Sequence, residues 1–114
     1  MREAESFLPL HPLEFRILLE LLEGPSHGYE IVRSIEAERG HGRVYPANLY
    51  RRIRDLLASE LIEEIDVESD DVAHARRRYV RVTRLGRSVA RAEARRLRAV
   101  VQDPRVDALL QTTR

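Results

Sequence analysis

The stretch "PANLYRRIRDLLASELIEEIDVE", residues 46–68, decides the fold, because the spacing of its apolar residues changes along it. In its first part four apolar residues recur at i, i+4, i+7 and i+8, which places them on one face of a helix. They are Leu49, Ile53, Leu56 and Leu57. Within residues 61–68, Ile65 and Val67 alternate with Glu64, Asp66 and Glu68, and a period of two is typical of a strand. The stretch therefore predicts a helix over residues 46–61 and a strand over residues 61–68.

A second strand returns along the first. The segment "RRRYVRVT", residues 76–83, repeats the period of two after a polar turn at residues 69–75, so the pair predicts a β-hairpin. The outgoing strand is acidic and the returning one is rich in arginine. The acids are Glu63, Glu64, Asp66 and Glu68, and the arginines are Arg76, Arg77, Arg78 and Arg81. Antiparallel pairing sets opposite charges across from each other, where each pair contributes about 0.2–1 kcal/mol.

Two helices are expected before this unit. In residues 11–24 Pro12 suits the first helical position and Gly24-Pro25 ends the helix. Its apolar residues surround the helix on all sides, so it must be covered on all sides, and a second subunit could supply one cover. Residues 25–40 predict the second helix, with Ser26 as its N-cap.

A last long helix is expected over residues 84–102, with Thr83 as its cap, and Asp103-Pro104 stops it. A short further helix is expected over residues 105–111. The long helix carries a narrow apolar stripe, which is typical of a helix–helix seam. The stripe consists of Leu85, Val89, Ala92, Leu97 and Val100.

Composition limits the class of protein. The 114 residues suit a single ordinary domain and include no cysteine, which excludes disulfide scaffolds and thiolate metal sites and is compatible with a cytoplasm. No run of 18 apolar residues exists and the N-terminus is unlike a signal peptide, so we expect a cytoplasmic protein without a membrane partner.

Charge is strongly segregated along the chain. Residues 1–40 and 41–75 each carry a net charge of −4, whereas residues 76–98 hold ten arginines against the single acid Glu93, a net charge of +9. A local basic block is an electrostatic footprint of nucleic-acid binding, although a charge run is also often a solvated helix face.

The sequence offers little enzymatic chemistry. The four histidines lie on different elements and lack the spacing of metal ligands. They are His11, His27, His41 and His74. No nucleophile triad, glycine-rich phosphate loop or pair of catalytic carboxylates stands out, so we expect neither enzymatic activity nor a cofactor or metal.

The order of elements is three helices, a hairpin and a helix. Helices two and three make a helix-turn-helix, and the hairpin that follows is a wing. The third helix turns arginines and Asn48 outward, and a major groove admits such a helix. The predicted fold is therefore mainly α with a small β-hairpin: a winged helix-turn-helix over residues 1–83, and a C-terminal helix and tail over residues 84–114, which the resemblance described next implies to be a dimerisation helix.

From about Leu10 to Val101 the chain resembles the PadR family of transcriptional regulators. The matching motifs are "HGYEI" at 27–31, "YPANLYRRIRDLLASELIEE" at 45–64 and "RRRYVRVTRLGR" at 76–87. The resemblance implies a winged-helix, homodimeric DNA-binding repressor of the shorter type, often released by a small ligand. Two positions depart from the family pattern: Ala47-Asn48 replaces its common Gly-Thr or Gly-Ser, and Glu60 replaces its usual glycine.

The candidate DNA contacts come from the second helix, the third helix and the wing. They are His27, Asn48, Tyr50, Arg51, Arg52, Arg54, Arg76, Arg77 and Arg78. Several of these side chains could instead have a purely structural role. Arg51 can pair with Asp55 at i+4, Tyr50 can pack under the wing, and some wing arginines can pair only with the acidic strand.

The candidate dimer contacts come from the first and last long helices. They are Leu85, Val89, Ala92, Leu97, Val100, Phe15 and Leu19. Most arginines of the last helix are expected to pair with acids within or across the dimer. Those arginines are Arg84, Arg87, Arg91, Arg95, Arg96 and Arg98, and the candidate acids include Glu14, Glu20 and Glu23.

A small hydrophobic or aromatic effector is expected between the same helices, lined by residues such as Phe7, Phe15, Leu19 and Leu97. Two alternatives to the DNA-binding regulator stay open. The acidic wing strand favours a winged-helix module that binds protein without DNA, and the histidines leave room for a metal-responsive switch.

Overall fold

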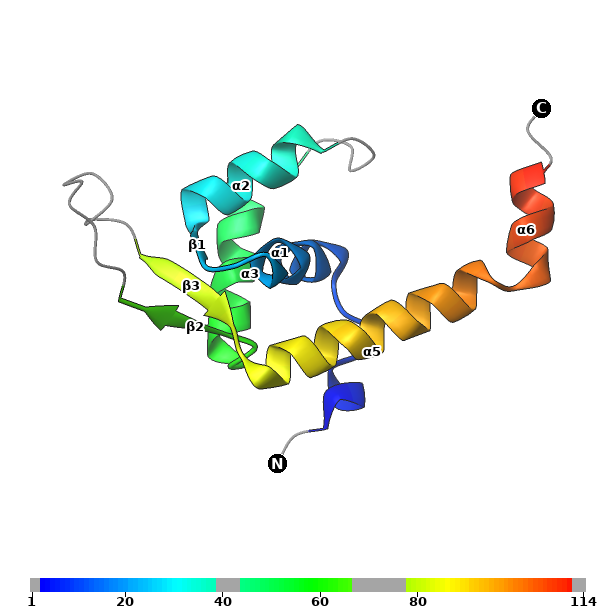
Figure 1. Cartoon of the computed structure of the whole chain (residues 1–114). Coiled ribbons are helices and arrows are strands. Elements are labelled where there is room, and N and C mark those ends of the chain that lie inside the picture. Colours follow the sequence, from blue (N-terminus) through cyan, green and yellow to red (C-terminus); the bar gives the residue numbers. More distant parts are fainter. Residues whose placement is uncertain (1–2, 39–43, 67–77, 112–114) are drawn as a thin grey trace.

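The computed structural model describes residues 3–38, 44–66 and 78–111 of the chain (Figure 1). Its elements, in order, are η1 (Ala4–Phe7), α1 (Pro12–Leu22), β1 (Ser26–His27), α2 (Gly28–Ala37), α3 (Pro46–Ala58), β2 (Ile62–Ile65), β3 (Tyr79–Val82), α5 (Arg84–Val101) and α6 (Pro104–Gln111). The predicted fold, mainly helical with a small antiparallel β unit between the third helix and the long last one, is confirmed.

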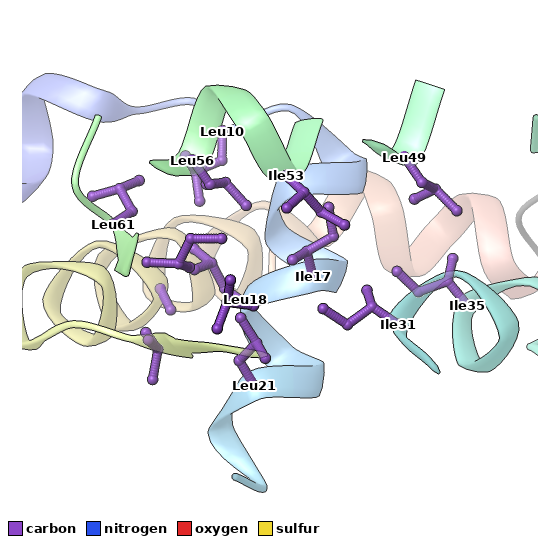
Figure 2. Close-up of a cluster of buried hydrophobic side chains, with 14 of the residues drawn as sticks. Leu10, Ile17, Leu18, Leu21, Ile31, Ile35, Leu49, Ile53, Leu56 and Leu61 are labelled. Atoms are coloured by element: carbon purple, nitrogen blue, oxygen red, sulfur yellow. The ribbon is translucent and has the colours of Figure 1, made fainter. Parts of the chain in front are cut away.

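Helix α1 lies at the centre of the core. His11 caps its first turn through Nδ1, which accepts a hydrogen bond from the Leu13 N–H, and Pro12 occupies the first helical position as predicted. Ile17 and Leu18 are fully buried, and α1 packs against α2, α3, α5 and β3. Figure 2 shows these side chains meeting leucines and isoleucines of the neighbouring helices. The helix is apolar on all sides because its own chain surrounds most of it.

The sheet has three strands in the order β1-β3-β2, all antiparallel, whereas the sequence predicted a two-stranded hairpin. The additional strand β1 pairs Ser26 with Val80 and His27 with Tyr79. The prediction of Ser26 as the N-cap of α2 is therefore wrong. Sheet pairing holds Ser26 before the helix, and His27 is the cap, with its Nδ1 accepting from the Glu30 N–H at 3.2 Å.

The expected charge pairing across the wing strands is confirmed for the described residues. Glu63 lies directly opposite Arg81, whose Nε donates to its carboxylate at 2.8 Å. Arg78 reaches Glu64 diagonally, with 3.4 Å between Nη1 and Oε1. The wing tip predicted at residues 69–75, with Arg76 and Arg77, lies outside the described residues.

Helix α3 ends in a Schellman turn. The Leu61 N–H donates to the Leu56 carbonyl at 3.0 Å, and the Glu60 N–H donates to the Leu57 carbonyl at 3.1 Å. This geometry requires a left-handed residue between helix and strand, and Glu60 takes that conformation with φ of 65°. The family's usual glycine at this position has a physical reason, because glycine adopts this φ without strain.

Helix α5 begins next to this turn between α3 and β2. Thr83 caps it as predicted, with Oγ1 accepting from the Gly86 N–H at 3.0 Å and donating to the Glu60 carbonyl at 2.8 Å. A Cβ added to Gly86 would lie 2.0 Å from the Leu61 carbonyl oxygen. Only glycine lets α5 approach the start of β2 this closely.

The C-terminal part of the chain extends away from this core. The first turns of α5 pack on α1 and η1, whereas the last turns project outward and carry α6 at their far end (Figure 1). The radius of gyration is 16.2 Å, against about 13 Å for a compact domain near this length. Large apolar side chains are exposed along the projecting part. They are Val100, Val101, Leu109 and Leu110.

Within the described residues, no helix combines the length and the apolar character that a membrane span requires.

Candidate nucleic-acid interface

Helix α3 separates an apolar face from a basic one. Leu49, Ile53 and Leu56 are buried against α1 and α2, as the spacing predicted. The opposite face exposes Asn48, Arg51 and Arg54, together with Asp55. A helix with this division can enter a groove of a duplex while its other side stays in the protein core.

The arginines of α3 differ in their surroundings. Arg52 leans toward α1, where its Nη1 lies 3.5 Å from Glu14 Oε2, and it also lies 3.8 Å from Asp55 Oδ2. The alternative pair of Arg51 with Asp55 does not form, and neither Arg51 nor Arg54 has an ion-pair partner among the described residues. Arg51 and Arg54 therefore carry the unneutralised charge of this face.

Two tyrosines lie where α3 meets the start of α2: Tyr50 on α3 and Tyr29 on α2. Tyr50 lies against Gly28, where an added Cβ would come within 2.9 Å of the tyrosine ring, so the two helices meet closely there. Tyr29 is 51% exposed, and the guanidinium of Arg33 lies 5.8 Å from the centre of its ring. Tyr50 therefore packs on the start of α2, and 42% of its surface remains exposed.

His27, a predicted DNA contact, is buried. Its Nδ1 accepts from the Glu30 N–H, and its ring meets Tyr79 edge to face with 5.2 Å between ring centres. The fold itself uses this side chain as a helix cap and as a packing partner for β3.

A groove of about 410 Å³ runs between α2, α3 and the sheet. We call it the tyrosine–arginine groove, because Tyr29, Tyr50, Arg54 and Arg78 line it. Arg78, which directly precedes the wing strand β3, contributes a highly exposed guanidinium 3.4 Å from Glu64. Hydroxyl and guanidinium donors that face one groove are the side chains that hold phosphate oxygens in protein–DNA contacts.

The predicted dimer residues divide by position along α5. Val89 is fully buried within its own chain, so it belongs to the core of the protomer. Four others are partly buried: Leu85, Leu97, Phe15 and Leu19. Ala92 is also partly buried, and Val100 on the projecting end is 50% exposed.

A second cavity, of about 460 Å³, lies between α1, the start of α3 and α5. Of the four residues predicted to line an effector site, Phe15 and Leu97 line this cavity, whereas Phe7 and Leu19 are not among its lining residues. Arg16 and Asn48 contribute polar groups to the wall. Asn48 therefore belongs both to this cavity and to the exposed face of α3.

Glu93 closes the cavity and was missed by the sequence analysis. Only 2% of this residue is exposed, and its carboxylate accepts from the Leu10 N–H at 3.1 Å and from Arg96 at 2.5 and 3.0 Å. The hydrogen bond from Arg96 holds the pKa of the Glu93 carboxyl below its ordinary value of 4.5, although burial acts in the opposite direction. The available signal was its position as the lone acid of a basic block.

The described residues bring no three histidine or carboxylate side chains together in an arrangement that could hold a metal ion.

A helix-turn-helix with a β wing, followed by a long projecting helix, defines the class: this is a winged helix-turn-helix protein. The model of the transcriptional regulator PadR-like family matches residues 17–92, two-thirds of the chain. The chain belongs to that family and is a transcription regulator of the PadR type. No curated protein matches its sequence significantly.

Solved structures share the fold at low sequence identity. A PadR family transcription regulator from Clostridium difficile is 19% identical, with a TM-score of 0.69, and the match covers 79% of this chain and 91% of that one. A PadR-like regulator from Bacillus cereus is 22% identical, with a TM-score of 0.70, covering 87% and 91%. PadR of Bacillus subtilis, crystallised with operator DNA, is 19% identical, with a TM-score of 0.61, covering 74% and 46%.

Proposed function

We propose that this regulator is a homodimeric repressor that binds a near-palindromic DNA site through α3 and the wing. The observation that carries the proposal is the exposed face of Asn48, Arg51 and Arg54 beside the tyrosine–arginine groove. The operator complex of the Bacillus subtilis relative supports the same kind of ligand for this chain.

The two parts of this surface would do different work. Arginine can bond guanine edges and asparagine adenine edges, so Arg51 and Asn48 are the residues that would read sequence in the major groove. Tyr29, Tyr50 and Arg78 would hold backbone phosphates, which supply affinity but no sequence information. Arg76 and Arg77, outside the described residues, remain proposed wing contacts.

A homodimer would bury the apolar surface that the protomer leaves exposed at the end of α5 and on α6. Val100, Leu109 and Leu110 lie there, and the partly buried Leu97, Phe15 and Leu19 lie on α5 and α1, which pack against each other. Two-fold symmetry would place the two α3 helices in successive major grooves, about 34 Å apart.

Ligand release would act through the cavity between α1, α3 and α5. Phe15 and Leu97 suit a small hydrophobic or aromatic effector, and the cavity volume of about 460 Å³ falls in the range of small-molecule sites. An occupant touching Asn48 would change the start of the recognition helix. The regulator would act in the cytoplasm by binding alone, without enzymatic chemistry.

The test is fluorescence anisotropy with a duplex from the region upstream of the protein's own gene. We expect salt-dependent binding that R51Q/R54Q weakens at least tenfold, because each lost base or phosphate contact costs about 1–3 kcal/mol. R51K/R54K should keep charge-dependent binding but lose sequence preference, since lysine cannot make the bidentate contact. R105Q, on α6, removes one charge as a control.

A protein-binding module is the second candidate, since the wing strand exposes Glu63 and Glu64. Their pairing with Arg81 and Arg78 neutralises much of that acidic character, which favours the regulator. If no duplex binds at low salt to the wild-type chain, the repressor proposal fails and the module is favoured.

A further inference from the structure

Helix α5 carries a second basic surface. Five of its arginines are exposed and recur at intervals of three or four residues; we call them the arginine stripe. They are Arg84, Arg87, Arg91, Arg95 and Arg98. With 3.6 residues per turn they fall within a sector of about 80°, and with a rise of 1.5 Å per residue they extend over about 21 Å.

The arginine stripe faces away from the protein. The side of α5 that is buried in the core carries Gly86, Val89, Ala90 and Glu93, and helical geometry puts the stripe on the opposite side. The apolar residues proposed for the dimer, such as Val100, continue the core side of the helix. The stripe is therefore outside both the core and the proposed dimer seam.

No residue of the arginine stripe has an ion-pair partner among the described residues. Most arginines of this helix are expected from the sequence to pair with acids. Among the described residues, Arg96 alone pairs with an acid of its own chain, Glu93. Like charges at i,i+4, such as Arg87 with Arg91 and Arg91 with Arg95, destabilise a helix by about 0.2–0.5 kcal/mol each. A bound polyanion would relieve this repulsion.

Charge complementarity decides between a second copy of the chain and a polyphosphate. In a two-fold dimer the stripe would meet its own copy only at the symmetry axis, where the two stripes would repel each other, and elsewhere it would need acids of the partner. The acids of α1 offer a poor match, because Glu14 already contacts Arg52, and only Glu20 on the helix and Glu23 at its C-cap remain for five arginines. A row of guanidinium groups suits a row of phosphates.

We propose that the arginine stripe binds the backbone of a second DNA duplex, so that the regulator bridges two DNA segments. Helix α1 packs against both α3 and α5 and lies between them, and Figure 1 shows α5 running away from α3. The stripe is thus a surface apart from the recognition face. Contacts to phosphates alone give no sequence preference, and five of them predict a slope of about −4.5 for log K against log salt.

The first experiment isolates the stripe in the R51Q/R54Q background. Anisotropy with a random-sequence duplex of about 24 base pairs should detect residual binding that weakens with salt, because the arginines of the stripe still contact phosphates. Adding R87Q/R91Q/R95Q should weaken that binding at least tenfold and reduce the slope by about 2.7, because three phosphate contacts are lost. R87K/R91K/R95K, with the same charge and similar helix propensity, should bind as the parent does.

The second experiment measures bridging. A biotinylated duplex from the upstream region is immobilised, and capture of a fluorescent random-sequence duplex is recorded. Wild-type protein should capture the second duplex. The R87Q/R91Q/R95Q variant should still bind the immobilised duplex but capture little of the second one, whereas R51Q/R54Q should lose preference for the upstream sequence. Failure of the stripe proposal and failure of the repressor proposal thus give different results.

Three outcomes would overturn the proposal. An unchanged salt slope in R87Q/R91Q/R95Q would show that the stripe does not touch DNA. Dissociation of the dimer by the same change, seen by sedimentation without loss of duplex binding, would show that a second copy covers the stripe. Binding to phosphatidylglycerol vesicles that depends on the stripe, with no stripe-dependent binding of duplex, would assign it to a lipid surface.

Discussion

Glu60 occupies a backbone conformation that favours glycine. Its φ of 65° closes the Schellman turn after α3, and for a residue with a Cβ this conformation costs roughly 1–2 kcal/mol. The sequence showed that a glycine of the family is replaced here, but the left-handed turn that explains the glycine became visible only in the structure.

The change Glu60→Gly should raise the free energy of unfolding by about 0.5–1 kcal/mol, because relief of strain exceeds the entropy that glycine loses on folding. Urea denaturation monitored by circular dichroism measures the change. Glu60→Ala is the matched control, since alanine removes the charge but keeps the Cβ. An equal stabilisation by alanine would assign the effect to charge and contradict this reading.

Glu93 holds the N-terminal segment against α5, because its buried carboxylate accepts from the Leu10 N–H and from Arg96. Glu93→Ala should lower the free energy of unfolding by about 1–3 kcal/mol, since a buried donor loses its partner. Glu36→Ala, at an exposed position on α2, should change stability by less than about 0.5 kcal/mol.

The same carboxyl predicts a pH dependence with a definite sign. Its pKa in the folded chain is lowered from 4.5, so the ionised form contributes stability that is present above 4.5 and is lost as pH falls through the lowered pKa. The stability advantage of wild type over Glu93→Gln should be constant near neutral pH and shrink below 4.5. An advantage that persists unchanged into acid would contradict the assignment.

At the scale of elements, periodicity predicted the first, third and last helices close to their observed bounds, because their apolar faces are buried as the spacing requires. It began the second helix three residues early, and the strands it predicted over 61–68 and 76–83 are longer than β2 and β3 in the described residues. It missed β1, since a strand of two residues is too short to show a period of two. It also missed the contact of Arg52 with Glu14 and the burial of Glu93, because both depend on how α1 packs against α3 and α5. Such long-range contacts leave no local pattern.

Thr83 connects the wing to the long helix. Its hydroxyl accepts from the Gly86 N–H and donates to the Glu60 carbonyl, so one side chain fixes both the start of α5 and the end of α3. Thr83→Ala should destabilise the protein by about 1 kcal/mol, as for other N-caps, and Thr83→Ser should be nearly neutral. Thermal unfolding of the two variants makes the comparison. A serine variant as unstable as the alanine one would shift the explanation from the cap to packing of the methyl group.

At the scale of the whole molecule, the projecting end of α5 together with α6 gives the protomer a larger radius of gyration than a compact domain of this length. Its exposed valines and leucines are the surface that a second copy would cover. Sequence periodicity predicted a seam on this helix, but it placed Val89 in the seam, and the structure buries that residue in the core of its own chain.

Val100→Asp should weaken the proposed dimer at least tenfold, because a charge would replace an apolar contact in the seam. The fold should be retained, since Val100 is already half exposed in the protomer. Analytical ultracentrifugation across protein concentration measures the dissociation constant, and Gln102→Glu, which adds a charge at an exposed neighbouring position, is the control. Equal weakening by both variants would point to general charge repulsion instead of a seam at Val100.

The central claim is that the exposed face of α3 lies in a duplex groove, and the absence of cysteine permits a direct measurement of it. A single cysteine is introduced by Ala47→Cys at the start of α3 and labelled with an iron–EDTA group that cleaves nearby DNA. The account predicts two clusters of cleavage on a bound upstream duplex, about one helical turn apart, and no localised cleavage from Gln102→Cys at the C-cap of α5. Localised cleavage from the α5 label alone, with none from the α3 label, would contradict it.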